Sequence, residues 1–291
     1  FVGKGSIIGG IQTVFQAILY AAKEFMEIIA TIALVTALSK CLIDLGSDYL
    51  LMTPMSRIMK NPSVTWWILG ITMFLFSLFL WPSPSVALVG AIMLPFAIKA
   101  GLNPLAAAIA MNLFGHGFAL SYDFVIQGAP SISASAASIS VTEFLSEGTP
   151  IFIVMGVVTV VSAFFIYRKS FSISPKMIVE QDTLPSKPTH FSAAAIFLAV
   201  LTPLAFLADI IAMIVFDFSG GSATSIVSGT ALLLMCLGAF LRFKKHSFSK
   251  VTSYITEGFS FAIRIFAPVI IIGAFFFLGG SGITEIMGEQ F

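Results

Sequence analysis

The segment 66–130 constrains the fold most, because its apolar runs are short and are separated by helix breakers. Residues 66–81 are apolar, but a helix that crosses a membrane needs about 20 such residues. Pro82 and Pro84 follow, and a proline ends a helix because it lacks an N–H and clashes with the preceding turn. A second short apolar run covers 86–100. The pattern predicts a re-entrant hairpin, whose two arms enter and leave the membrane on the same side.

The next apolar run predicts a membrane helix over 104–130 that is broken in its middle. Leu105–Phe114 is followed by Gly115-His116-Gly117, and the apolar pattern resumes at Phe118. Irregular backbone survives at membrane depth only where protein or a watery cavity satisfies its polar groups. Many secondary transporters build a substrate site from broken helices of this kind.

The composition places these segments in an integral membrane protein. Hydrophobic residues make up 58% of the chain and charged residues 10%, whereas a soluble domain carries about 25% charged residues. The apolar runs are continuous rather than alternating, so the expected fold class is all-α, with no barrel. The formal net charge of +1 argues against nucleic-acid binding. The two cysteines form no metal-site pattern, and no cofactor is expected.

The remaining segments are expected to alternate between crossings and polar connections. A long helix over 11–39 leads into an amphipathic interfacial arm over 41–60. Lys23 and Glu27 lie four residues apart in the long helix and are expected to pair. A crossing over 149–167 ends at a basic linker over 168–190. Further crossings are expected over 191–217, 223–241 and 251–280.

Charge orients these segments, because loops rich in Lys and Arg stay in the cytoplasm. The basic loops 168–190 and 242–250 are therefore expected inside, and 131–148 and 218–222, which lack Lys and Arg, outside. The segment 66–100 must then begin and end inside. A hairpin and two complete crossings both satisfy this condition; the short arms and the four-residue tip favour the hairpin.

Opposite directions of the first and last long helices suggest an inverted repeat. Residues 11–39 run inward and 251–280 run outward, and an alignment of 23–45 with 264–286 places Phe25 opposite Phe266. Residues 1–167 are then the first repeat, 168–190 the cytoplasmic linker, and 191–291 the start of a second repeat. A second hairpin is missing, so the chain is expected to be a fragment.

This order of elements resembles the ion transporter superfamily, which includes divalent-anion/sodium symporters, gluconate permeases and C4-dicarboxylate carriers. The stretch WPSPSVALVGAIMLPFAIKAGLNPLAAAIAMNLFGHG is similar to their hairpin and broken helix. The resemblance implies a homodimeric symporter or permease in the inner (cytoplasmic) membrane. It would carry a small organic anion, such as a carboxylate, with H+ or Na+. The tip Pro82-Ser83-Pro84-Ser85 departs from the Ser-Asn-Thr tip of sodium-coupled members, which favours protons.

Polar residues at the tip and the break are the candidate substrate and ion ligands. The helix that begins near Val86 directs its positive end at the tip, which favours an anion there. His116 changes charge near neutral pH, but it can equally bond a neighbouring backbone group. An intramembrane carboxylate such as Asp123 suggests function, although a salt bridge to Lys23 or Arg264 is the structural alternative. Asp209 is a weaker candidate. The candidate ligands are Ser83, Ser85, Asn112, Gly115, His116, Gly117 and Asp123.

Two other functional classes remain open at this point. One is an intramembrane enzyme that uses His116, Ser121 and Asp123, but the chain has no HExxH or GxSxG motif, so no enzymatic activity is expected. The other is a non-transporting scaffold subunit, which would leave the ionisable groups near the helix break unexplained.

Overall fold

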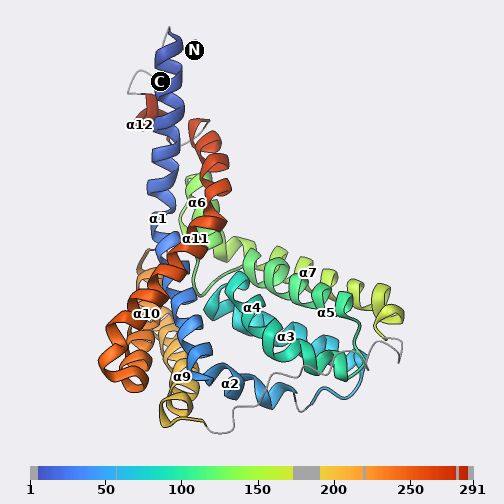
Figure 1. The fold of residues 1–291 in the computed structure, drawn as a ribbon. Helices are drawn as coiled ribbons and strands as arrows, with labels where there is room; N and C mark the ends of the chain where they lie inside the picture. The colour runs from blue at the N-terminus through green and yellow to red at the C-terminus, as the bar shows by residue number, and fades with distance from the viewer. Residues whose placement is uncertain (1–5, 57, 173–190, 219–220, 280–281, 288–291) are drawn as a thin grey trace.

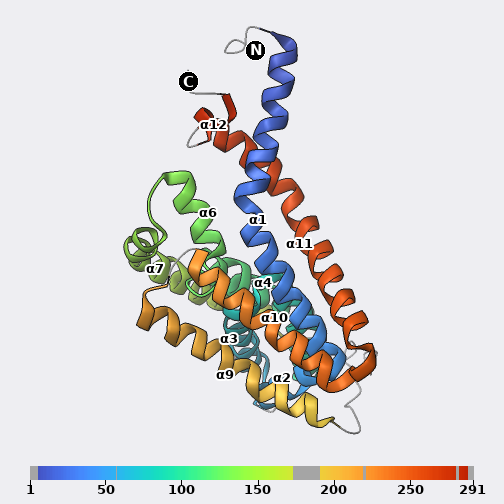
Figure 2. The same ribbon diagram turned by 90° about the vertical axis from the view of Figure 1, so that its left-hand side faces the viewer.

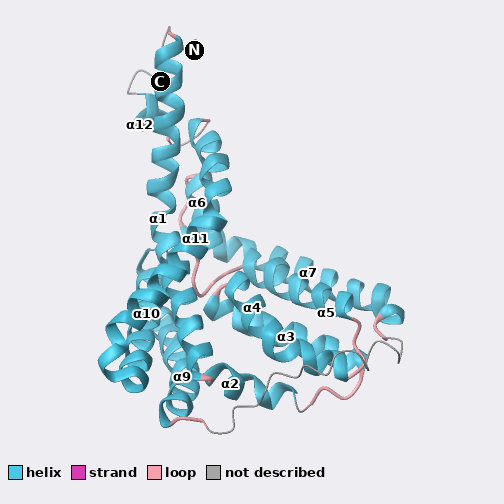
Figure 3. Ribbon diagram, in the orientation of Figure 1, coloured by secondary structure: helices cyan, strands magenta, loops and turns pink. Residues whose placement is uncertain are grey.

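The computed structural model describes all residues except 1–5, 57, 173–190, 219–220, 280–281 and 288–291. The described residues form helices joined by loops, as Figure 3 shows, and the β-pairing among them is one isolated bridge between Leu102 and Ser172. Four described stretches are long and apolar enough to cross a membrane: Ile7–Leu45, Val141–Ser170, Ala193–Phe216 and Gly221–Leu278. The prediction of an all-helical membrane protein is confirmed.

Helix α1 (Ile7–Leu45) is the longest element and packs antiparallel to α11 (Ser247–Leu278). Lys23, early in α1, bonds Glu285 just after α11, with 3.3 Å between Nζ and Oε1. Near the other end, Lys250 Nζ lies 2.8 Å from Asp44 Oδ2. The opposite directions expected from charge are therefore present. The expected ion pair between Lys23 and Glu27 is not observed. Lys23 pairs with Glu285, and Glu27 accepts a hydrogen bond from the Thr224 hydroxyl.

Helices α9 (Ala193–Phe216) and α10 (Gly221–Phe243) pack against α1 and against each other. The chain turns back after α10 at Lys244, whose φ of 45° places it in the left-handed region. The short 3-10 helix η3 (Lys244–His246) then leads into α11. This basic turn lies at the same end of α1 as Asp44, so the structure brings the 242–250 segment and the end of α1 together.

The hairpin follows α2 (Ser47–Ser56) and consists of α3 (Pro62–Leu80) and α4 (Pro82–Lys99). Its arms are longer than predicted because the PSPS segment is not a loop. The chain reverses at Trp81 alone, with φ of 63°, and Pro82 begins α4. Proline suits the first turn of a helix, where its missing N–H would have had no partner and its φ is already helical.

The expected broken helix over 104–130 differs from the structure in the position of its break. Helix α5 (Pro104–Met111) continues without interruption into η1 (Asn112–Ala119), a π-helix in which the Leu120 N–H donates to the Gly115 carbonyl. The Gly-His-Gly segment widens the helix rather than ending it. The backbone leaves the helix at 122–127 and re-forms one as α6 (Gly128–Ala137).

Helix α7 (Val141–Tyr167) begins well before the predicted crossing at 149 and is followed by η2 (Arg168–Ser170). The expected external loop over 131–148 is therefore mostly helical, formed by α6 and the first turns of α7. The capping hydroxyl of Ser140, which accepts from the Glu143 N–H, explains the early start. Most of the predicted linker, 173–190, lies outside the described residues.

The helices form two groups, visible in Figures 1 and 2. Helix α1 stands as a column with α11 along it and α9 and α10 around its lower half. The hairpin, α5–η1 and α7 extend away from this column in Figure 1, and Figure 2 shows α6 beside α1, on the side opposite α11. The short α12 (Ile283–Met287) lies against the first half of α1.

Candidate functional site

The π-helix η1 packs against the first arm of the hairpin, through one face of α3. Gly70 leaves room for the Phe114 ring, which a Cβ at Gly70 would meet at 2.4 Å. One turn further along α3, Met73 lies against Gly115, where an added Cβ would come within 2.5 Å of Met73 Cε. The same added atom would lie 3.1 Å from Ser77 Oγ. Gly115 therefore presents bare backbone to the end of α3 that is nearest the tip.

Two serine hydroxyls near the tip are buried without a protein partner. Ser77 is 3% exposed and Ser85 is not exposed at all. Neither Oγ atom has a hydrogen-bond partner among the described residues. A buried hydroxyl without a partner costs about 1–3 kcal/mol, so such groups are uncommon and often mark sites of function. The two serines flank the tip residue Trp81 from opposite arms.

The sequence-predicted ligands divide between different faces of this region. Ser85 and Gly115 lie on α4 and η1, which pack against each other and against α3. Asn112 and Gly117 are exposed, and His116 is half-buried. Ser83 belongs to the first turn of α4, but its side chain lies outside the described residues. The structure therefore places Ser85 and Gly115 on elements that pack against each other, whereas Asn112 and Gly117 are exposed.

Asp123 lies in the break and holds the start of α6. Its Oδ1 accepts from the Ile126 N–H and its Oδ2 from the Gly128 N–H, both at 3.0 Å. The side chain is 2% exposed. Asp123 forms no described ion pair, and Lys23, one of its two suggested partners, pairs with Glu285 instead. The observed geometry is that of a helix cap, which satisfies amide groups that α6 and the preceding turn would otherwise leave unbonded.

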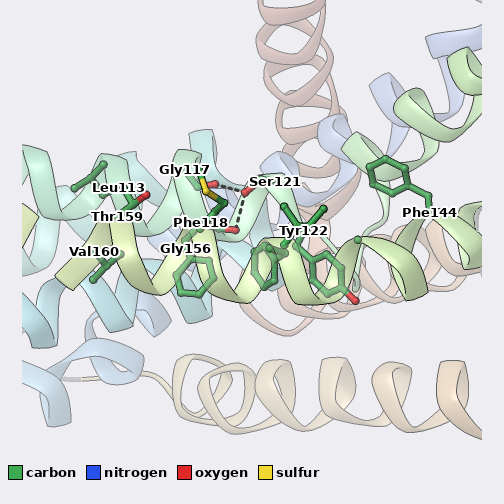
Figure 4. A pocket seen from close by; sticks show the side chains of 13 residues that line it. Leu113, Gly117, Phe118, Ser121, Tyr122, Phe144, Gly156, Thr159 and Val160 are labelled. Carbon is green, nitrogen blue, oxygen red and sulfur yellow. Dashed lines mark hydrogen bonds between the residues drawn. The ribbon is translucent and has the colours of Figure 1, made fainter. Parts of the chain in front are cut away.

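The other face of η1 borders a groove of about 440 Å³ against α7. Figure 4 shows its lining, which includes Gly117, Phe118, Ser121 and Tyr122. The Ser121 hydroxyl donates to the carbonyls of Gly117 and Phe118, so it is used within the helix. The Phe118 ring lies over Gly156, and the Tyr122 hydroxyl donates to the Leu145 carbonyl at 2.9 Å. The groove is therefore mainly apolar, and its Ser121 and Tyr122 hydroxyls already have partners.

Asp209, the weaker candidate, is buried in α9 away from the tip. Its Oδ1 accepts from the Thr230 hydroxyl of α10 at 2.9 Å, and it is 6% exposed. The described residues contain no group of three or more His, Cys, Asp or Glu placed to hold a metal ion.

Two features of the site were missed by sequence reasoning. Ser77 is one of the few polar residues in the run 66–81, and it lies four residues before the tip; this isolated hydroxyl was the available signal. The sequence signal for the π-helix was weaker. Two glycines within three residues are also typical of an unwound segment, which is the interpretation that the sequence analysis favoured.

Comparison with known proteins finds a similarity that extends over almost the whole chain. The chain is 41% identical over 292 aligned residues to a Bacillus subtilis (strain 168) protein named "Uncharacterized membrane protein YhfA". The alignment covers 98% of the chain and 62% of that relative, so the chain spans less than two thirds of the relative's length. No family model and no solved structure matches the chain. Its apolar helices and this similarity identify it as a multi-pass membrane protein.

Proposed function

We propose that this protein is a secondary active transporter, a permease that carries a small organic anion such as a carboxylate by alternating access. The observation that supports it most is the pair of buried hydroxyls of Ser77 and Ser85 at the tip of a helical hairpin. A shorter apolar helix, Pro104–Ala119, widens into a π-helix and packs against the same hairpin. π-Helical segments occur frequently at functional sites.

The N-terminus of α4 supplies the charge preference of this site. Helix α4 begins at Pro82, so the positive end of its dipole lies at the tip beside Ser85. Hydroxyl donors at the positive end of a helix suit a carboxylate. The proposed driving ion is H+ or Na+, and a homodimer in the inner (cytoplasmic) membrane is part of the same proposal.

The resemblance to the ion transporter superfamily, with its inverted repeats, is also a proposal. Its support is the antiparallel packing of α1 and α11, together with the contact between Phe25 and Phe266. Their ring centroids lie 6.0 Å apart. Residues at equivalent positions of two repeats meet when they lie near the axis that relates the repeats.

Uptake into proteoliposomes tests this proposal. We expect a labelled dicarboxylate or sugar acid to accumulate under a pH or sodium gradient, and Ser77→Ala and Ser85→Ala to reduce that uptake by roughly tenfold or more. Without substrate, both variants should be as stable as the wild type, because neither loses a protein hydrogen bond. Thr65→Val is the matched control, since the Thr65 hydroxyl is also buried and without a described partner but lies far from the tip. Unchanged uptake in both serine variants would show that the hydroxyls at the tip take no part in transport.

A further inference from the structure

The tip of the hairpin is seated against the first residue of α6. A Cβ added at Gly128 would lie 2.4 Å from Cζ3 and 2.5 Å from Cη2 of Trp81, and 3.4 Å from Cγ2 of Ile28. The outer ring of Trp81 therefore occupies the space that any larger residue at 128 would need. Trp81 is 6% exposed, so α6 and its neighbours cover almost the whole ring.

Hydrogen bonds connect this contact to Ser85 on one side and to Asp123 on the other. The Ser85 N–H donates to the Trp81 carbonyl at 3.1 Å, which ties the first turn of α4 to the tip residue. On the other side, Asp123 binds the amides of Ile126 and Gly128 and so fixes the orientation of Gly128. A continuous path of contacts runs from Asp123 through Gly128 and Trp81 to Ser85.

Helix α6 has room to move away from the tip. Cavities of about 200 Å³ and 400 Å³ separate it from α1 and α11, and Ile132 lines both. The residues at its two ends, Gln127 and Ser138, have φ of 59° and 58°. Non-glycine residues in this left-handed conformation are strained and concentrate at clamps and switch regions. The start of α6 is held by Asp123 and Trp81, and the helix also packs against α7.

We infer that Trp81 and Gly128 form a latch that closes the hairpin tip against α6, with Asp123 as the positioning residue that sets it. Closed, the latch keeps Ser85 buried in the first turn of α4, beside Trp81. Displacement of α6 from Trp81 frees the tip and exposes Ser85. The opening itself does not depend on the proposed function. Only the statement that a transported anion enters through it rests on that function.

Cysteine labelling tests the latch without substrate or gradient. Purified Ser85→Cys protein in lipid nanodiscs is treated with N-ethylmaleimide, and mass spectrometry follows the label at position 85, with native Cys41 and Cys236 as internal references. We expect slow labelling at position 85, because this position is fully buried. Adding Gly128→Ala should increase the rate by roughly tenfold or more, since the new methyl group displaces the Trp81 ring and raises the open population.

A compensating substitution separates the latch from general disruption. Trp81→Phe lacks the outer ring atoms that meet Gly128, so adding it to Ser85→Cys/Gly128→Ala should return labelling towards the slow rate. Gly148→Ala is the matched control, because a Cβ there meets nothing within 4 Å, and it should leave the rate unchanged. Asp123→Asn removes one of the two hydrogen bonds that Asp123 accepts from backbone N–H groups. It should increase labelling of the thiol at position 85 while Cys41 stays unreactive.

Two results would overturn the inference. One is equal labelling of Ser85→Cys with and without Gly128→Ala. The other is fast labelling in the Trp81→Phe/Gly128→Ala combination while Cys41 stays protected. If Gly128→Ala does not fold, the Asp123→Asn variant replaces it. An unchanged labelling rate at position 85 in that variant would then overturn the inference. A latch that opens in a protein without uptake would refute the transport proposal alone, whereas uptake with no latch response would refute this inference alone.

Discussion

Gly258 of α11 lies directly against the carbonyl oxygen of Ala33 in α1, and a Cβ added to Gly258 would sit 2.1 Å from that oxygen. Backbone meets backbone here, with no side chain between the two helices. Membrane helices associate through such close approaches at small residues, because lipid provides no hydrophobic drive for their packing. This contact fixes how α11 lies along the column formed by α1.

We expect Gly258→Ala to destabilise the protein by about 2 kcal/mol or more, because the obstructing atom is backbone and cannot rotate away. The measurement is the melting temperature of the detergent-purified protein by fluorescence-detected size exclusion. Gly229→Ala is the control, since nothing lies within 4 Å of a Cβ there. It should be neutral or stabilising by up to about 1 kcal/mol, as expected for alanine in a helix. Equal stability of the two variants would refute the close crossing.

Gly115→Ala should loosen the contact between η1 and α3. The added methyl group meets the Met73 side chain at 2.5 Å, and we expect a loss of about 1–3 kcal/mol. Met73 is flexible, so part of the loss should be relieved by Met73→Ala. A double-mutant cycle of thermal stabilities measures this coupling. Additive effects would show that residues 73 and 115 do not meet.

Removal of the Asp123 carboxylate should destabilise α6. Asp123→Ala leaves two amide groups without their acceptor, and we expect a loss of about 1–3 kcal/mol. Asp123→Asn keeps one acceptor oxygen and should lose less. Glu147→Gln, at an exposed residue, is the control. Full stability with loss of pH-driven uptake would instead assign Asp123 to proton transfer.

Asp48 should make stability depend on pH. It lies in α2, outside the spanning helices and 8% exposed, and burial raises its pKa to about 6, against the opposing backbone hydrogen bonds from Tyr49 and Asp48. The folded protein thus binds the Asp48 proton more tightly than the unfolded chain does. The stabilisation from this proton is complete below about pH 4 and disappears as the pH rises through about 6.

Asp48→Asn should therefore raise stability at pH 7.5 by about 2 kcal/mol and change little at pH 4. Melting temperatures of both proteins across this range provide the measurement. A variant less stable than the wild type at pH 7.5 would mean that the backbone hydrogen bonds to the carboxylate outweigh the cost of its burial.

Much of the fold follows from the sequence, because apolar runs and charge determine spans and directions. The antiparallel α1 and α11, and the crossings formed by α9 and α10, lie where the runs place them. The predictions of helix boundaries were wrong mainly at proline and glycine residues. Pro82 was interpreted as ending a helix, but position decides the effect of proline, and it begins α4. The polar 131–148 segment was interpreted as loop, yet serine and alanine form α6 once Asp123 caps it.

The candidate site was predicted only in part, for a similar reason. A motif shows which residues lie close in sequence but not which side of a helix each one faces. The four predicted residues of the Asn112–Gly117 segment differ in burial: Gly115 is packed against α3, His116 is half-buried, and Asn112 and Gly117 are exposed. Ser77 joins the site from the other arm, through a contact that local sequence does not encode.

The π-helix η1 links the contact with α3 to the groove beside α7, because both depend on the same wide helical turn. Gly115 faces α3 and Gly117 faces the groove beside α7, and the wide turn of η1 sets the angle between them. Tightening η1 to an α-helix would rotate later residues relative to earlier ones, by about 100° for each residue of register lost. Both glycines would then leave their present neighbours in a single movement. We expect a molecule bound in the groove to disturb the contact of Gly115 with α3, although this contact lies on the other face of η1.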